Sequence, residues 1–159
     1  MYEKIKKLSI LIVFVIANIL TTQVFADACG VVVINKGSLN VRSKPIQITK
    51  VVSQVAKGSA LRILGVSGAW YKVKLNNGKI GYGNVDYIKE LTTRSPEKCG
   101  FVVTKKTPLN IRKAPSLNAR RVAKAAKGSA LRILELGEWC KVKLNNGKIG
   151  YASSDFIHQ

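Results

Sequence analysis

Hydrophobic and polar residues alternate over short stretches of the chain. Val73 and Leu75 alternate with Lys72 and Lys74, so a strand at this position places the two kinds of side chain on opposite faces. We expect the lysine face to be exposed to solvent. After the first 26 residues no stretch has the spacing of a helical stripe. The pattern therefore predicts an all-β chain.

Turn signals separate the predicted strands. Residues 76–78 and 145–147 both read Asn-Asn-Gly, and an Asn-Gly pair is typical of a tight type I′ hairpin, in which both central residues have positive φ. Further signals recur in both halves of the chain: Lys57-Gly58 and Lys127-Gly128, and Pro45 and Pro115. Four or five short strands separated by such turns predict a small barrel or sandwich.

Two phrases of the sequence are repeated letter for letter. KVKLNNGKIGY stands at residues 72–82 and 141–151, and AKGSALRIL at 56–64 and 126–134. Around them the two halves align at an offset of 70 residues, which falls to 69 after a one-residue deletion in a loop. Such a repeat indicates that each copy is one structural unit.

The repeat sets the expected domain boundaries. We expect a first domain at residues 27–90 and a second at 99–159. Residues 91–98 between them are mostly polar and include a proline, as expected of a linker. Whether the two domains pack together or swing about this linker is left open by the sequence.

The first 26 residues have the features of an export signal. Three lysines precede an apolar run at residues 8–20, and Val-Phe-Ala at 24–26 offers small residues for a cleavage site. The run has 13 residues, whereas a spanning helix needs about 20, so we expect no transmembrane span in the mature chain. Two alternatives remain: a retained anchor, and cleavage after Ala28 to give a lipoprotein that begins at Cys29.

The chain is strongly basic. It has 27 Lys and Arg against 8 Asp and Glu, a formal net charge of +19, and both halves share the excess. A uniformly basic surface attracts polyanions, which for an exported protein include envelope polymers and acidic proteins. We expect no specific nucleic-acid partner. The alternative interpretation is a solvated surface whose lysines only maintain solubility.

Three cysteines follow the signal segment. An oxidising compartment permits disulfides, but Cys29, Cys99 and Cys140 allow three alternative single pairings. The sequence does not choose among them. Cys140 stands where the first copy has Tyr71, so it is also interpretable as a small apolar substitute. The cysteine spacing does not match a metal site, and we expect no metal and no cofactor.

Three motifs occur in the same order in both copies. In the first copy they are Leu39-Asn40-Val41-Arg42, Trp70-Tyr71-Lys72-Val73 and Gly78-Lys79-Ile80-Gly81-Tyr82. Their order and spacing resemble the bacterial SH3 (SH3b) domain family over residues 31–88 and 101–157, with tyrosine in place of the usual tryptophan after the last glycine. The resemblance implies two tandem five-stranded SH3-like β-barrels, joined by a short linker after the signal segment. It also implies an exported protein that binds cell-wall peptidoglycan or its peptides.

The candidate binding residues are those that the two copies share. Trp and Tyr combine a rigid apolar body with a polar edge, which suits grooves for extended peptides or sugars. The alternative for every candidate is a structural role in the core or at a strand end. The candidates are Trp70, Tyr82, Tyr87, Asn40 and Arg42 in the first copy, and Trp139, Tyr151, Phe156, Asn110 and Arg112 in the second.

We do not expect catalysis. The one histidine, His158, is next to the C-terminus, so no Ser–His or Cys–His arrangement is expected. Asp86 and Asp155 are repeat equivalents and are interpreted as turn or cap residues.

The function that these observations predict is binding without catalysis. We predict an exported protein, periplasmic or secreted and associated with the cell wall, that binds peptidoglycan or another anionic envelope polymer. The alternative is an adaptor or secreted factor that recognises an acidic protein.

Overall fold

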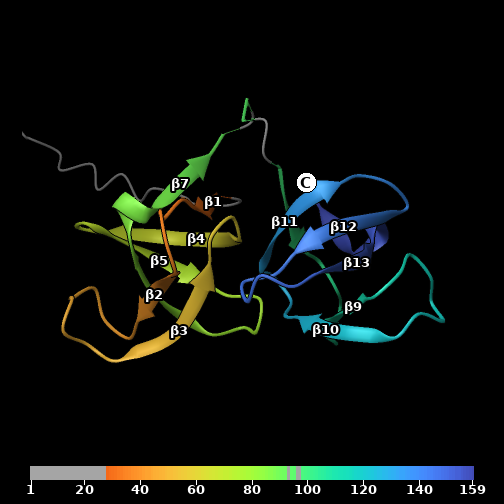
Figure 1. Cartoon of the computed structure of the whole chain (residues 1–159), viewed down its shortest axis with the longest axis horizontal. Coiled ribbons are helices and arrows are strands. Elements are labelled where there is room, and N and C mark those ends of the chain that lie inside the picture. The colour runs from red at the N-terminus through yellow and green to blue at the C-terminus, as the bar shows by residue number, and fades with distance from the viewer. Residues whose placement is uncertain (1–27, 93, 96–97) are drawn as a thin grey trace, which may run out of the picture.

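The computed structural model describes residues 28–92, 94–95 and 98–159 (Figure 1). The predicted signal segment, residues 1–26, lies outside the described residues. Regular structure in the described part consists of strands and two single-turn 3-10 helices, η1 (Val85–Tyr87) and η2 (Ser154–Phe156). None of the helices described is long and apolar enough to cross a membrane. The prediction of an all-β chain is confirmed.

The first domain is one antiparallel sheet in the order β3-β2-β6-β5-β4-β1-β7. The resemblance implied five strands, whereas this sheet has seven. The first and last strands along the chain, residues 29–32 and 88–91, pair with each other, from Cys29 opposite Leu91 to Val32 opposite Ile88. Its strands are β1 (Cys29–Val32), β2 (Ser38–Arg42), β3 (Val51–Ala56), β4 (Ala60–Ser67), β5 (Trp70–Lys74), β6 (Ile80–Asn84) and β7 (Ile88–Leu91).

The second domain repeats this sheet, in the order β10-β9-β13-β12-β11-β8-β14. Its register follows that of the first domain, since Trp139 pairs with Ser153 as Trp70 pairs with Asn84. The strands are β8 (Lys98–Val102), β9 (Leu109–Arg112), β10 (Arg121–Ala125), β11 (Ala130–Glu135), β12 (Trp139–Lys143), β13 (Ile149–Ser153) and β14 (Ile157–His158).

Each sheet curls around its own apolar core. Alternation decides which side chains enter it: Val73 of β5 is fully buried while its neighbour Lys72 is exposed. Val41 and Leu61 join the first core, and Ile111 and Leu131 take the corresponding places in the second. Cys140 is a free, fully buried thiol within the second core, which agrees with its interpretation as a small apolar residue.

The Asn-Asn-Gly turns differ from the predicted type I′ hairpin. Among the described residues only glycines have positive φ, Gly78 at 85° and Gly147 at 81°, so neither asparagine of a turn adopts that conformation. The backbone N–H of Gly78 donates to the carbonyl of Leu75 at 2.9 Å, which gives a turn followed by a left-handed glycine. The backbone N–H of Leu75 donates to the carbonyl of Lys79 at 2.9 Å, so the loop has three residues, whereas a type I′ hairpin has two.

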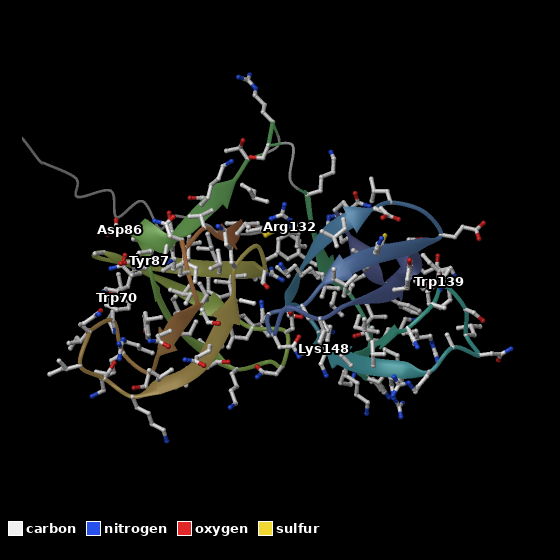
Figure 2. All side chains as sticks on the ribbon, in the orientation of Figure 1. Trp70, Asp86, Tyr87, Arg132, Trp139 and Lys148 are labelled. Atoms are coloured by element: carbon white, nitrogen blue, oxygen red, sulfur yellow. A yellow bond between two sulfur atoms is a disulfide. The ribbon has the colours of Figure 1, made fainter. Side chains whose placement is uncertain are left out.

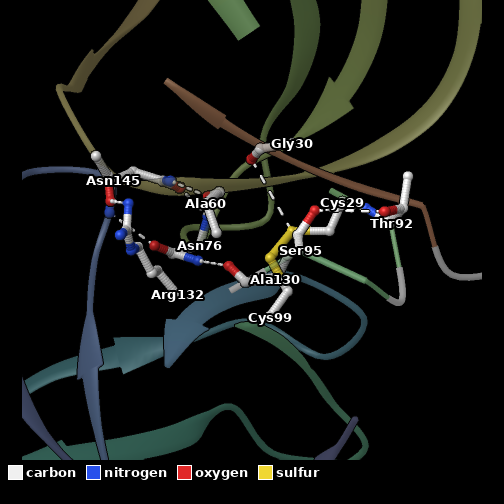
Figure 3. Close-up of a disulfide and its surroundings, with 11 residues drawn as sticks. Cys29, Gly30, Ala60, Asn76, Thr92, Ser95, Cys99, Ala130, Arg132 and Asn145 are labelled. Carbon is white, nitrogen blue, oxygen red and sulfur yellow. Dashed lines mark hydrogen bonds between the residues drawn. A yellow bond between two sulfur atoms is a disulfide. The ribbon is translucent and has the colours of Figure 1, made fainter. Parts of the chain in front are cut away.

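The two domains pack against each other around an approximate twofold axis. The disulfide joins Cys29 to Cys99, which are equivalent positions on β1 and β8 with their Cα atoms 6.5 Å apart (Figure 3). Ala60 of β4, Ala130 of β11 and Phe101 are buried beside it in one apolar cluster. The guanidinium of Arg62 lies 4.9 Å from the centre of the Phe101 ring, a cation–π distance. The structure thus selects one of the three disulfide pairings.

Two buried asparagines form the centre of the interface (Figure 3). The backbone N–H of Asn76 donates to Oδ1 of Asn145 at 2.6 Å, and that of Asn145 donates to Oδ1 of Asn76 at 2.7 Å. The side-chain amide of Asn76 donates to the carbonyl of Ala130, and that of Asn145 to the carbonyl of Ala60. Each asparagine is therefore satisfied by the other domain, as buried polar groups require.

Basic side chains border the same interface in symmetric pairs. Lys74 Nζ donates to the carbonyl of Lys127 at 2.7 Å, and Lys143 Nζ to the carbonyl of Lys57 at 2.7 Å. Lys72 is exposed, as predicted for the lysine face, whereas Lys74 is partly covered because its amine bonds to the second domain. Arg62 and Arg132 likewise reach the carbonyls of Gly128 and Gly58. The sequence left open whether the two domains pack together or swing about the linker, and the structure shows them packed together.

Candidate functional site

The two domains have corresponding grooves, built from equivalent residues. The first has a volume of about 330 Å³ and the second about 600 Å³. Both run between the loop before the second strand of the domain, the long proline-containing loop, and the 3-10 turn. Equivalent residues that line them are Asn40 and Asn110, Arg42 and Arg112, Trp70 and Trp139, and Tyr87 and Phe156.

The tryptophan of each groove stands at a strand end. Trp70 is the first residue of β5 and is half-buried. The residue before it, Ala69, accepts a backbone hydrogen bond from Val85 at 3.0 Å, which ties the start of β5 to the 3-10 turn. That turn carries Tyr87, whose side chain is 49% exposed. Figure 2 shows Trp70 and Tyr87 at the same end of the first domain.

Arginines hold the long loops that form one wall of the grooves. Arg42 donates to the carbonyl of Thr49 at 2.7 Å, and Arg112 donates to the carbonyl of Ala119 at 2.9 Å. The Thr49 hydroxyl in turn donates to the carbonyl of Ile46 at 2.9 Å. Arg42 and Arg112 also line the grooves. Each arginine therefore holds the loop by a hydrogen bond and adds positive charge to the groove.

Most of the predicted site residues meet in the grooves. Trp70, Tyr87, Asn40 and Arg42 line the first, and Trp139, Phe156, Asn110 and Arg112 line the second. Tyr82 and Tyr151 line neither groove. On the sheet, Tyr82 pairs with Lys72 on one side and with Arg42 on the other. Tyr151 likewise pairs with Lys141 and with Arg112, so each tyrosine is next to a groove arginine.

The two grooves differ in polarity. Gln47 lines the first at the position where Leu117 lines the second. Tyr87 is replaced by Phe156, which lacks the hydroxyl, and Val103 and Pro108 add apolar surface to the second groove only. The second groove is therefore the larger and more apolar of the two.

Positive charge borders both grooves. Lys36 and Arg42 line the first, and Lys105, Lys106 and Arg112 line the second. Among the described acidic residues, Asp155 alone reaches a groove, and its carboxylate accepts a hydrogen bond from Ser153 at 3.2 Å. An anionic ligand is therefore favoured at either site.

The resemblance placed the long loops at residues 43–49 and 113–119 beside the aromatic candidates, but no individual loop residue was among the candidates. Gln47, Leu117 and Pro108 line the grooves but differ between the copies, and the candidates were residues that the copies share. Sequence reasoning also missed Asn84, whose Oδ1 accepts the backbone N–H of Asp86 at 2.8 Å and caps the 3-10 turn. Pro108 directly precedes the shared motif at Leu109, and this position was the signal available for it.

The described residues do not bring together a cluster of three or more metal-ligating side chains. Asp86 and Asp155 each lie in the first turn of a 3-10 helix, as expected for turn residues. His158 is exposed on β14. Absence of catalysis stays a prediction.

Tyr71 and Lys141, two of the described side chains outside the grooves, have shifted pKa values. Burial raises the pKa of Tyr71 above its usual 10.0, and the nearby carboxylate of Glu90, which accepts the phenol hydrogen bond at 3.3 Å, raises it further. The hydrogen bond from Lys141 to Glu135, at 2.6 Å, raises the pKa of that lysine.

The family described as "Bacterial SH3 domain" matches residues 37–89 and 107–158. A protein of Bacillus subtilis (strain 168), YrvJ, named as a candidate N-acetylmuramoyl-L-alanine amidase, is 25% identical over 162 aligned positions, which cover 99% of this chain and 31% of the relative. The chain therefore spans about a third of the length of that curated relative.

Two solved structures are similar over 84% of this chain. They are NlpC2 and NlpC1 of Trichomonas vaginalis, each 15% identical, with TM-scores of 0.38 and 0.37. The match covers 48% of the first and 45% of the second.

Proposed function

Because the chain belongs to the bacterial SH3 domain family and carries two such domains, we propose that it is an exported, non-catalytic protein that binds cell-wall peptidoglycan. The observation that carries this proposal is the pair of grooves. Each has an aromatic wall beside a basic loop, at the same place on two copies of one fold. An aromatic face suits sugar rings and peptide stems, while the cations attract carboxylates.

Two further observations support a site in the cell envelope. The relative in Bacillus subtilis is named for an activity on the bond between N-acetylmuramic acid and L-alanine, a bond found in peptidoglycan. The disulfide between Cys29 and Cys99 suits an oxidising compartment, as does the signal-like start of the sequence. Both support a periplasmic or wall-associated protein.

Binding without turnover is the mode that we propose. The chain spans about a third of its relative, and the grooves contain neither histidine nor cysteine. The catalytic activity in the relative's name is therefore not extended to this chain. The acidic-protein alternative stays a prediction.

Co-sedimentation with intact peptidoglycan sacculi tests the proposal. The purified mature chain is mixed with sacculi at low salt and at several-fold higher salt, since screening weakens surface charge interactions. We expect retention at both salt concentrations, and its loss in a folded Trp70→Ala/Trp139→Ala double variant. Retention that disappears on adding salt, or that the double variant keeps, would reject the groove as the site.

A further inference from the structure

The interface between the domains determines where the two grooves lie relative to each other. It joins equivalent surfaces, so that each contact occurs twice: Asn76 with Asn145, Lys74 with the carbonyl of Lys127, and Lys143 with the carbonyl of Lys57. Such an isologous contact relates the two copies by a twofold rotation. A groove that lies away from the axis on one domain must therefore have its counterpart on the opposite side.

One strand links each groove to the interface. β5 begins at Trp70 in the groove and ends at Lys74, which bonds to the second domain. β12 runs in the same way from Trp139 to Lys143. Four steps of strand measure about 13 Å, so each tryptophan lies a strand length outward from the interface. Figure 2 shows Trp70 and Trp139 near opposite ends of the long axis of the molecule.

The interface also holds this arrangement in place. A disulfide crosses it at Cys29 and Cys99, and buried asparagines and alanines fill it. The backbone N–H groups of Ala56 and Ala126 donate to the carbonyls of Asn145 and Asn76 at 2.7 Å each. Covalent, apolar and hydrogen-bonded contacts together oppose a rotation that would bring the grooves to one side.

We infer that the chain is a rigid bridge, which binds two separate peptidoglycan segments at its opposite ends and cross-links them. This rests on the proposed function, and it adds a mechanical role to binding. A short ligand that fills one groove does not reach the other. Duplication of the domain then joins two strands, instead of only tightening the hold on one.

The charge of the chain favours this role. Two anionic strands that approach each other repel, and a basic body between them offsets the repulsion. Without the predicted signal segment, which holds three lysines and one glutamate, the formal net charge of +19 becomes +17. Lys36 lines one groove, Lys105 and Lys106 line the other, and both ends are thus basic. The unequal polarity of the grooves allows the two ends to hold segments with different strength.

A two-layer capture experiment tests the bridge. Peptidoglycan fragments are immobilised, the protein is bound at raised salt and washed, and labelled soluble peptidoglycan fragments are then added. We expect the wild type to capture the second layer. Trp70→Ala and Trp139→Ala each keep one groove, so they bind the surface but lose second-layer capture at least tenfold per bound molecule. Val66→Ala, an exposed change outside both grooves, retains it.

Several outcomes separate the bridge from the proposed function. Wild type that binds the surface but captures no second layer overturns the bridge alone. Second-layer capture that persists in both Trp70→Ala and Trp139→Ala also overturns the bridge, provided that each variant is a monomer. Light scattering measures whether the variants are monomeric. Wild type that does not bind the surface overturns both proposals. Tyr87→Ala and Phe156→Ala, at exposed rings, repeat the experiment should a tryptophan variant fail to fold.

Discussion

Asn76 and Asn145 each accept the other's backbone N–H across the domain interface, at 2.7 and 2.6 Å. Both residues belong to the repeated phrase KVKLNNGKIGY. The second phrase, AKGSALRIL, supplies the other side of the same interface through Ala60, Arg62 and their counterparts. A self-complementary surface needs the same groups in both copies, which gives a physical reason for the letter-for-letter identity.

Removing one of these asparagines is expected to destabilise the chain. Asn76→Ala leaves the N–H of Asn145 and the carbonyl of Ala130 without their buried partners, and we expect the free energy of unfolding to fall by about 2 kcal/mol. Denaturant unfolding measures the change. Asn77→Ala is the matched control, because Asn77 is exposed and bonds only within its own turn. Equal effects of the two substitutions would contradict the role of Asn76.

The inter-domain disulfide is expected to contribute more. It closes a loop across 70 residues, and in the chain-entropy account its removal costs about 4 kcal/mol or less. A Cys29→Ala/Cys99→Ala double variant should therefore unfold at lower denaturant than the wild type in the absence of reductant. Cys140→Ala keeps the bond and removes only a buried thiol. A double variant that is no less stable than the wild type would mean that the bond adds nothing to the packed interface.

The polarity of the grooves is expected to depend on one loop residue. Leu117→Gln should weaken binding of an apolar fluorescent dye to the second groove about tenfold, and Gln47→Leu should strengthen binding to the first. The dye buries part of the leucine side chain, and a contribution of about 1.4 kcal/mol is tenfold in affinity. A fluorescence titration measures both affinities. Leu136→Ala, an exposed apolar change outside the grooves, should have no effect. Equal dye affinity in the two reciprocal variants and the wild type would show that the loops do not set the preference.

Arg42 is expected to order the loop that walls the first groove. Its guanidinium holds the carbonyl of Thr49 at 2.7 Å, so Arg42→Ala should speed hydrogen exchange across residues 43–49 by about tenfold. Arg42→Lys keeps the charge but not the fork of donors, and it should restore exchange only in part. The corresponding loop at 113–119, held by Arg112, serves as the internal reference. Unchanged exchange in Arg42→Ala would exclude this positioning role.

Tyr71 is expected to make stability sensitive to alkali. Burial, followed by Glu90, raises its pKa above the usual 10.0, so the folded state holds the phenol proton more tightly than the unfolded state. The stabilising contribution is complete below pH 10 and is lost as the pH rises through the folded pKa. Absorbance of tyrosinate against pH measures the shift, and Tyr71→Phe should remove the late step.

Glu90→Gln separates the two causes of this shift. Because burial is the larger cause, the pKa of Tyr71 should fall in this variant but stay above its usual value. A complete return to the usual value would mean that the carboxylate, and not burial, dominates.

Much of the fold could be predicted from local pattern. Alternation at Val73 and Lys72 identified which face of a strand is buried, because neighbouring side chains on a strand point to opposite faces. Part of the candidate site could be predicted from the repeat, since Trp70 and Arg42 stand in motifs that both copies share. The loop residues Gln47 and Leu117 could not be predicted, because their place in a groove depends on how distant segments meet.

The sequence by itself determined two all-β domains of one family, with equivalent aromatic and basic residues in each. Only the tertiary structure decided which cysteines pair, which asparagine of each Asn-Asn-Gly turn is buried, and where the two grooves lie relative to each other. Strand formation and turn signals depend on neighbours in the chain, which the sequence displays directly. Packing of one domain on the other depends on surfaces that exist only after each sheet has curled, and it is there that Asn76 meets Asn145.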